Sequence, residues 1–127
     1  MLAEGGSGRK LSNEDEVTEF LVKQGFQIYA TDSLSQSEQA SLFNSASVIV
    51  SVHGAALSNI IFCKNGTWVI EIFNSVIPTC YKGIAEISGL NYMPVSVSGE
   101  DCIDSSARSD FRVDIKLIEK GLSRVKL

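Results

Sequence analysis

The residues best suited to binding chemistry are His53 and Gly54, which follow a strongly apolar stretch. Residues 47–52 read Ser-Val-Ile-Val-Ser-Val, a β-branched run typical of a strand buried on both faces. The chain then breaks at His53-Gly54 and continues with Ala55 and Ala56, which can begin a helix. A helix that begins directly after a strand leaves backbone N–H groups unpaired, and these donors attract an anion, most often a phosphate. We therefore expect this turn to form the floor of a binding cleft.

The residue types in this turn fit that chemistry. Gly54 lets the backbone approach a ligand closely, and the small side chain of Ala55 keeps the start of the helix open. The His53 imidazole can donate a hydrogen bond to a phosphate oxygen, and when protonated it adds positive charge.

A second candidate is Glu71, near the end of the next apolar strand, residues 67–73. A carboxylate between Ile70 and Ile72 costs free energy unless it is paired or reaches a cleft. Hydrogen bonds to the two hydroxyls of a ribose would satisfy it, as in dinucleotide-binding folds, where the acid follows the glycine turn by about 20 residues. Together with the turn, Glu71 indicates a nucleotide-sugar or dinucleotide site. The alternative is that His53 and Glu71 are purely structural.

Composition limits the classes of function. The chain has 127 residues, 44% of them hydrophobic and 20% charged, which fits one domain able to bury a sizeable core. A net charge of −4 with no run of Lys or Arg argues against nucleic-acid binding. No apolar segment approaches the ~20 residues of a membrane span. The N-terminus lacks an apolar signal core, so we expect a cytoplasmic location.

Several common sites are missing from the sequence. The three cysteines are far apart and there is one histidine, so no zinc-type cluster is predicted; we expect small, partly buried side chains at Cys63, Cys80 and Cys102. Neither a P-loop nor the glycine fingerprint of dehydrogenases follows a strand, which disfavours a dehydrogenase-type dinucleotide domain.

The elements that must position these residues follow from capping and periodicity. We expect residues 1–12, with their Gly-rich stretch, to be a flexible loop. A helix should begin after Ser12 or Asn13 and end at Gly25, followed by a short strand over 26–30. A capping box begins the next helix, whose apolar face is predicted to carry the following residues: Ala40, Leu42, Phe43 and Ala46.

Beyond the turn, the pattern of helices and strands continues. We expect a helix through Leu57, Ile60 and Ile61 and a strand over 67–73. A helix over 79–88 should carry its apolar residues partly inward, and a strand over 91–97 contains Pro94, which suggests an edge or strand-start position. Residues 98–108 read as a polar loop before a last helix. The inward residues predicted for the helix over 79–88 are Tyr81, Ile84, Ala85 and Ile87.

This alternation predicts parallel βαβ units. The expected fold is therefore a single α/β domain over residues 1–127, a Rossmann-like open and mostly parallel sheet of about four strands with helices on both faces. Ligands bind beyond the carboxyl ends of the strands in such sheets.

Four blocks of sequence, in this order and spacing, resemble the C-terminal, nucleotide-sugar-binding part of family 61 glycosyltransferases. The resemblance covers nearly the whole chain. The family includes xylosyl-, arabinosyl- and N-acetylglucosaminyl-transferases, and bacterial proteins of capsular polysaccharide biosynthesis. The blocks are Gly8-Arg9-Lys10-Leu11-Ser12-Asn13-Glu14-Asp15-Glu16-Val17, Leu34-Ser35-x-x-Glu38-Gln39-x-x-Leu42-Phe43, Val52-His53-Gly54-Ala55-Ala56-Leu57-Ser58-Asn59 and Val69-Ile70-Glu71-Ile72.

The resemblance implies the C-terminal half of a GT-B architecture that is inverting and needs no metal or other cofactor. The donor substrate would be a nucleotide diphosphate sugar, expected to be UDP-linked, and the acceptor a glycan or protein hydroxyl. His53, Gly54 and Ala55 would line the diphosphate and sugar. Asn59 would brace the turn and Glu71 would hold the ribose. Without a metal, cations and helix N-terminal amides must stabilise the leaving diphosphate, and Arg9 would be such a cation.

Two departures from the family keep an alternative open. A family strand ending in Ser-Arg aligns with Ala3-Glu4, which puts an acid where a phosphate-binding arginine is usual. The N-terminal acceptor domain, expected to carry the catalytic base, has no counterpart here, so the catalytic residue is unassigned. The alternative is a truncated, non-catalytic nucleotide-binding or assembly module. Its partner would be the missing domain or, through an exposed sheet flank, a second copy in a homodimer.

Overall fold

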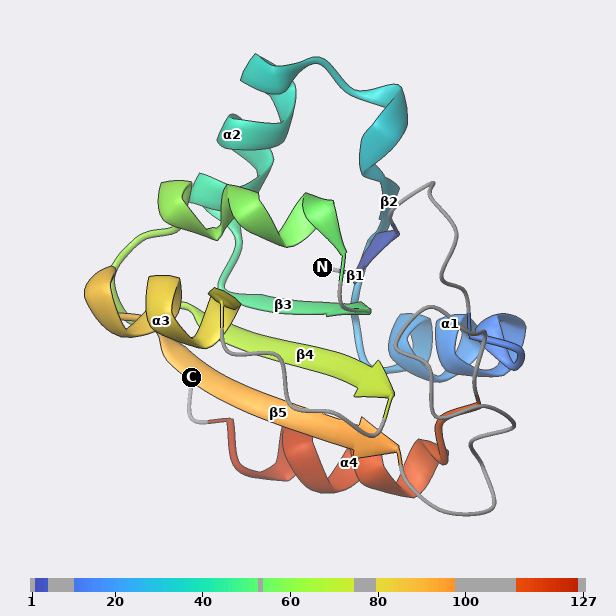
Figure 1. Cartoon of the computed structure of the whole chain (residues 1–127). Helices are drawn as coiled ribbons and strands as arrows, with labels where there is room; N and C mark the ends of the chain where they lie inside the picture. The colour runs from blue at the N-terminus through green and yellow to red at the C-terminus, as the bar shows by residue number, and fades with distance from the viewer. Residues whose placement is uncertain (1, 5–10, 53, 75–79, 98–111, 126–127) are drawn as a thin grey trace.

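A parallel sheet of five strands, in the order β2-β1-β3-β4-β5, forms the centre of the molecule. The computed structural model describes residues 2–4, 11–52, 54–74, 80–97 and 112–125. In Figure 1 the arrowheads of β3, β4 and β5 point to the same end of the sheet. This architecture confirms the predicted Rossmann-like α/β fold. The strands are β1 (Leu2–Glu4), β2 (Ile28–Ala30), β3 (Val48–Val52), β4 (Trp68–Asn74) and β5 (Asn91–Val97).

The sheet has one strand more than the sequence predicted. The prediction placed residues 1–12 in a loop, whereas Leu2–Glu4 forms β1 and pairs on both sides, with Leu2 beside Ile28 and Val50. Three residues before a Gly-rich stretch are too short for an alternating pattern to be recognised. Pairing with two neighbouring strands stabilises this segment instead, and such pairing is a long-range property.

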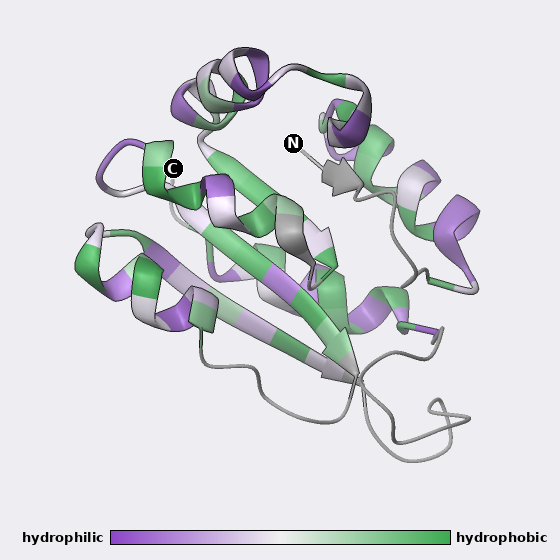
Figure 2. Cartoon of the chain, turned by 45° about the horizontal axis from the view of Figure 1, so that its top comes forward, coloured by the Kyte–Doolittle hydropathy of each residue, from purple (hydrophilic) through white to green (hydrophobic). Residues whose placement is uncertain are grey.

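Helices cover both faces of the sheet. One face carries α1 (Glu14–Lys23) and α4 (Ile115–Ser123), and the other carries α2 (Gln36–Ser45), η2 (Ala55–Phe62) and α3 (Cys80–Ile87). Among the described helices, none is long and apolar enough to cross a bilayer. The strand residues in Figure 2 are mostly hydrophobic, as strands buried on both faces require.

Side-chain alternation along the strands separates two apolar clusters. The first, under α1 and α4, contains Leu11, Val17, Leu21, Val48, Val50, Ile70, Ile72, Val95, Val113 and Ile118. The second, under α2, η2 and α3, contains Phe43, Ile49, Leu57, Ile60, Val69, Ala85 and Leu90. Consecutive residues of one strand point to opposite faces, so Ile49 and Val50 belong to different clusters. This alternation also assigns the polar residues of the strands to a face.

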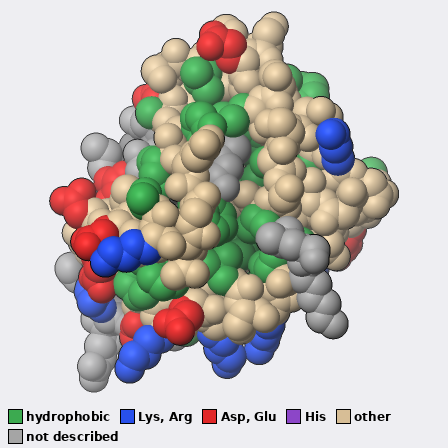
Figure 3. Space-filling view, turned by 180° about the vertical axis from the view of Figure 1, so that it is seen from behind, with side chains coloured by type: hydrophobic (Ala, Val, Ile, Leu, Met, Phe, Trp, Pro, Cys, Tyr) green, Lys and Arg blue, Asp and Glu red, His purple; other side chains and the backbone are tan. Residues whose placement is uncertain are grey.

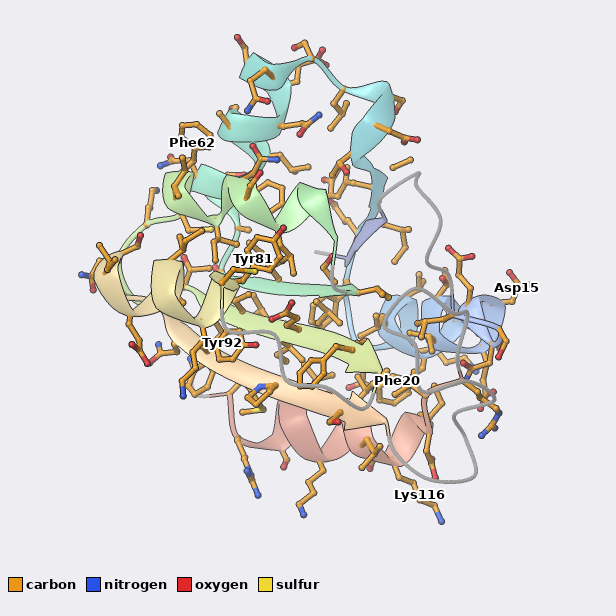
Figure 4. All side chains as sticks on the ribbon, in the orientation of Figure 1. Asp15, Phe20, Phe62, Tyr81, Tyr92 and Lys116 are labelled. Atoms are coloured by element: carbon orange, nitrogen blue, oxygen red, sulfur yellow. The ribbon has the colours of Figure 1, made fainter. Side chains whose placement is uncertain are left out.

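Charged residues provide much of the solvent contact of the helices. In Figure 3, hydrophobic side chains gather in the middle of the face seen from behind, and Lys and Arg side chains lie along its lower edge. Figure 4 shows Asp15 on α1 and Lys116 on α4 pointing away from the sheet. Helices α1 and α4 thus combine an apolar inner side with a charged outer side, as expected for a surface helix.

The predicted capping box at α2 is confirmed. The backbone N–H of Glu38 donates to Ser35 Oγ at 3.1 Å, and the backbone N–H of Ser35 donates to the Glu38 carboxylate at 3.1 Å. The hydrogen bond from the Ser35 backbone N–H, and then the interaction with the Ser35 side chain, favour the ionised carboxylate and lower the pKa of Glu38. The local sequence alone therefore fixes where α2 begins.

Asn13 occupies the N-cap position of α1, but its side chain has another role. Its Nδ2 donates to the carbonyl oxygen of Val113 at 2.7 Å, and its Oδ1 accepts from the N–H of Val113 at 3.1 Å. Arg112 also lies 3.7 Å from the carboxylate of Glu16. One carboxamide satisfies both backbone groups of Val113. The start of α1 is thereby tied to the residues that precede α4.

Strand β5 lies at the edge of the sheet, as Pro94 indicated. The N–H of Asn91 donates to the carbonyl of Thr67 at 2.9 Å, toward β4. Because N–H groups alternate in direction along a strand, the nitrogen of Pro94 faces away from β4. Proline therefore removes a donor only from the open edge, where it also hinders pairing with another strand.

Two apolar residues of predicted helices are exposed, and one of them, Ile87, was predicted to face partly inward. The segment after Gly54 is a 3₁₀ helix, with i to i+3 spacing, so Leu57 and Ile60 are buried while Ile61 is 56% exposed. Ile87, at the end of α3, is 89% exposed because it lies on the helix side opposite the buried Ala85. In both cases apolar character was present without the spacing that would bury it.

Replacing Gly89 by alanine should destabilise the fold. Gly89 has φ +69°, and a Cβ there would lie 2.3 Å from Nδ2 of Asn65. The left-handed backbone costs an L-residue roughly 1–2 kcal/mol. We expect at least that loss in the free energy of unfolding, measured in urea. Gly83→Ala, in a helix where an added Cβ would have nothing within 4 Å, serves as control and should not lose stability; equal stability of both variants would contradict the expectation.

Candidate functional site

The chain reverses its direction of winding between β1 and β3. From β1 it proceeds to β2 on one side and then crosses to β3, β4 and β5 on the other side. In open parallel sheets, ligands bind in the crevice outside the carboxyl ends of the strands at such a switch point. Here the two carboxyl ends are Glu4 of β1 and Val52 of β3. The predicted His53-Gly54 turn directly follows the second of them.

At Gly54 the backbone does not itself require glycine. Its φ of 175° and ψ of 173° are extended, a conformation that any residue adopts. A Cβ at Gly54 would contact only the carbonyl oxygen of Val52, at 3.8 Å. The first turn of η2 begins here, since the N–H of Leu57 donates to the carbonyl of Gly54 at 3.1 Å. Among the described residues, neither the backbone conformation nor the packing around Gly54 requires a glycine.

Asn59 is buried and connects the turn to α2. Its Nδ2 donates to the carbonyl of Ala56 at 3.0 Å and to Oε1 of Gln39 at 2.8 Å, and its Oδ1 accepts from Gln36 at 2.9 Å. All these partners belong to the protein. The geometry is that of a bracing residue, and contact with a ligand stays a prediction.

Glu71 lies deeper in the sheet than the sequence indicated. It pairs with Ser51, is fully buried, and precedes the end of β4 at Asn74 by three residues, about 10 Å at the usual rise of a strand. Phe73 is also buried and points to the same face of the sheet, between Glu71 and the carboxyl end. Its predicted contact with a ribose is thus not preformed at the open end of the strand.

Polar side chains of three neighbouring strands meet on the α3 side of the sheet. Tyr92 of β5 donates a hydrogen bond from its hydroxyl to Glu71 Oε1 at 2.5 Å, and Ser51 of β3 is the ladder neighbour of Glu71. Tyr81 of α3 and Tyr92 both pack against the second apolar cluster (Figure 4). Burial, and then the hydrogen bond and charge of Glu71, raise the pKa of Tyr92. The Tyr92 hydroxyl therefore remains a donor to the buried carboxylate at neutral pH.

The remaining predicted site residues are placed as follows. His53, Arg9 and Cys102 lie outside the described residues, as does the side chain of Ala55. Cys80 is exposed, contrary to the expectation, whereas Cys63 is partly buried and its pKa is raised to about 11 by that burial. Among the described residues, no group of three or more His, Cys, Asp or Glu could hold a metal ion.

Sequence reasoning quoted Gln39 as part of a block but gave it no role. The structure shows that its carboxamide makes three hydrogen bonds, to Thr31, Leu34 and Asn59. The repeated Gln and Asn at Gln36, Gln39 and Asn59 were the available signal. Their mutual contacts depend on how α2 packs against η2, which a single sequence does not reveal.

Comparison with known proteins shows which family model matches the chain. The model of the family "Glycosyltransferase 61" matches residues 4–70, just over half of the 127 residues. That range includes the carboxyl ends of β1 and β3 and the whole of η2, and it stops one residue before Glu71. The family model therefore covers both strands at the switch point.

Curated relatives are EGF domain-specific O-linked N-acetylglucosamine transferases. The protein from Drosophila melanogaster is 29% identical over 87 residues, which is 66% of this chain and 17% of the relative. The Xenopus laevis protein is 30% identical over 90 residues, 67% of this chain and 17% of the relative. For the Mus musculus protein the identity is 26% over 98 residues, 73% of this chain and 19% of the relative. The chain thus spans less than a fifth of the length of these relatives, and it belongs to glycosyltransferase family 61.

Proposed function

We propose that this chain is the donor-binding part of a glycosyltransferase, the C-terminal half of a GT-B architecture. Its substrate there would be a nucleotide diphosphate sugar, with the diphosphate seated at the β1–β3 switch point. The observation that carries the proposal is the turn at Gly54, where a strand gives way to η2 and a glycine occurs without a conformational need for it. Exposed amides at a helix start are suited to phosphate oxygens.

The chemistry asked of this half is binding and charge stabilisation. Transfer of the sugar leaves a nucleoside diphosphate, whose developing negative charge must be stabilised by donors already in place. Backbone N–H groups at the start of η2, with His53 and Arg9 as predicted cationic or polar partners, would supply them without a metal. In the proposed inverting reaction, the base that deprotonates the acceptor belongs to another domain.

The relatives suggest the sugar and the acceptor. Their names specify an O-linked N-acetylglucosamine and a protein acceptor. We propose the same classes for the protein to which this chain contributes, namely transfer of N-acetylglucosamine from a UDP-linked donor to a protein hydroxyl. Because the matched region is 17–19% of each of these relatives, acceptor recognition is assigned to segments beyond it.

Glu71 is the proposed ribose ligand, but its burial limits how a ribose could reach it. Its carboxylate is fully buried and already accepts a hydrogen bond from Tyr92. A ribose hydroxyl could reach it only after the side chains above it have moved. Loss of binding in Glu71→Ala together with unchanged stability would support direct contact, whereas joint loss of both would indicate a supporting role.

Titration calorimetry with UDP, GDP and NAD tests the proposal. We expect micromolar UDP binding by the wild-type chain, lost in His53→Ala, with NAD not bound. Glu86→Ala, which removes an exposed carboxylate on α3, is the matched control for Glu71→Ala and should bind UDP like the wild type. A folded chain that binds none of the three nucleotides would contradict the proposal.

One observation favours the alternative of a non-catalytic assembly module. Glu4 is the last residue of β1, at the switch point where the family usually has an arginine. An acid beside a diphosphate weakens its binding by charge repulsion. The calorimetry separates the two functions, because an assembly module would fold and bind none of these nucleotides.

A further inference from the structure

We infer that Gln39 is a positioning residue of the nucleotide site, which fixes two loops on either side of β1 relative to each other. The inference rests on the proposed function and adds to it a residue with no assigned role. Gln39 is the fourth residue of α2 and belongs to neither of the loops that follow β2 and β3. Its carboxamide nevertheless contacts segments that follow both β2 and β3.

Toward β2, Gln39 binds the connection that leads from the strand to α2. Its Nε2 donates to the carbonyl of Thr31 at 2.8 Å and to the carbonyl of Leu34 at 3.1 Å. Thr31 directly follows the last residue of β2 and is 2% exposed. Both amide hydrogens of Gln39 are thus used to hold this one connection.

Toward β3, Gln39 acts through Asn59. Its Oε1 accepts from Asn59 Nδ2 at 2.8 Å, and the same nitrogen donates to the carbonyl of Ala56 at 3.0 Å. Asn59 is 4% exposed, and Ala56 is the second residue of η2, directly above the Gly54 turn. The buried Asn59 side chain therefore links Gln39 to the start of η2.

The strand order shows why these hydrogen bonds of Gln39 matter for the nucleotide site. Since β1 lies between β2 and β3, the segments that Gln39 joins follow the two strands that flank β1. A ligand bound beyond the carboxyl end of β1 would therefore lie between them. A ligand seated there would contact loops held by one carboxamide, so their spacing need not be established when the ligand binds. Such preorganisation lowers the cost of binding.

The test compares Gln39→Met with Gln36→Met. Both substitutions remove a carboxamide from α2, but the exposed Gln36 donates to Asn59, whereas Gln39 also binds the connection after β2. We expect Gln39→Met to weaken UDP binding roughly tenfold in calorimetry. Gln36→Met should remain within about twofold of the wild type. A structural role alone would lower stability in urea without this change in affinity.

Hydrogen exchange provides the second measurement. Gln39→Met should increase amide exchange both at residues 31–34 and at residues 54–57, whereas Gln39→Glu, which keeps the acceptor for Asn59 but loses both donors, should increase it at 31–34 alone. Equal UDP affinity of Gln39→Met and wild type, or exchange that rises in only one loop of Gln39→Met, overturns this inference alone. A wild-type chain that binds no UDP overturns the proposed function and this inference with it.

Discussion

Replacing Gly54 by leucine is expected to weaken UDP binding about a hundredfold while the free energy of unfolding changes little. The extended backbone at Gly54 suits any residue, and a Cβ would meet only the Val52 carbonyl at 3.8 Å. Folding therefore tolerates a side chain there. Phosphate binding by the η2 amides should not tolerate it, because the leucine side chain would occupy the position of the phosphate. Loss of two hydrogen bonds to a charged group, at about 1.5 kcal/mol each, gives this factor.

Calorimetry with UDP and urea unfolding on the same variants measure the two halves of this expectation. Gly54→Ala should give an intermediate affinity, because a methyl group occupies less of the crevice. Gly83→Leu is the matched control, since a Cβ at Gly83 has nothing within 4 Å and the residue lies within α3. A Gly54→Leu variant that folds and binds UDP as tightly as the wild type would contradict the proposed function, because the space at Gly54 would then not be needed for a phosphate.

The parts of the fold that the sequence predicted depend on local patterns. The β-branched run of β3, the Ser35–Glu38 capping box and the glycine after α1 each act within a few residues. The predicted inward position of Ile87 was wrong, because apolar character was taken as burial where the last turn of the helix directs the side chain outward. Strand β1 was missed because its stability comes from neighbours distant in sequence.

The candidate site divides in the same way. The turn at Gly54 could be located from the transition between strand and helix, and the structure places it at the switch point. The depth of Glu71 in the sheet could not be predicted from the sequence, because it depends on the register of β4 against β3 and β5. The Gln39–Asn59 contact joins residues 20 positions apart, through packing of α2 on η2. Long-range register and packing are therefore what the sequence left undetermined.

Replacing Tyr92 by phenylalanine should lower the free energy of unfolding by about 2 kcal/mol at pH 7, the usual cost of removing the donor from a buried acceptor. The ring stays in the second apolar cluster, so the change removes only the donor to the buried Glu71 carboxylate. Tyr29→Phe is the control, because the hydroxyl of Tyr29 donates to the exposed Gln27. Tyr29→Phe should lower the free energy of unfolding far less.

The pH dependence of the Tyr92→Phe variant gives a sharper test of the same contact. The pKa of Tyr92 is raised in the folded chain, so the folded state holds this proton more tightly than the unfolded state does. The resulting stability is fully present below the unfolded pKa of about 10 and is lost as the pH rises above it. The gap in unfolding free energy between wild type and Tyr92→Phe should therefore be constant from pH 7 to 9 and narrow above pH 10. A gap that stays constant through pH 11, while the Tyr29→Phe control behaves like the wild type, would mean that the hydroxyl and Glu71 are not coupled.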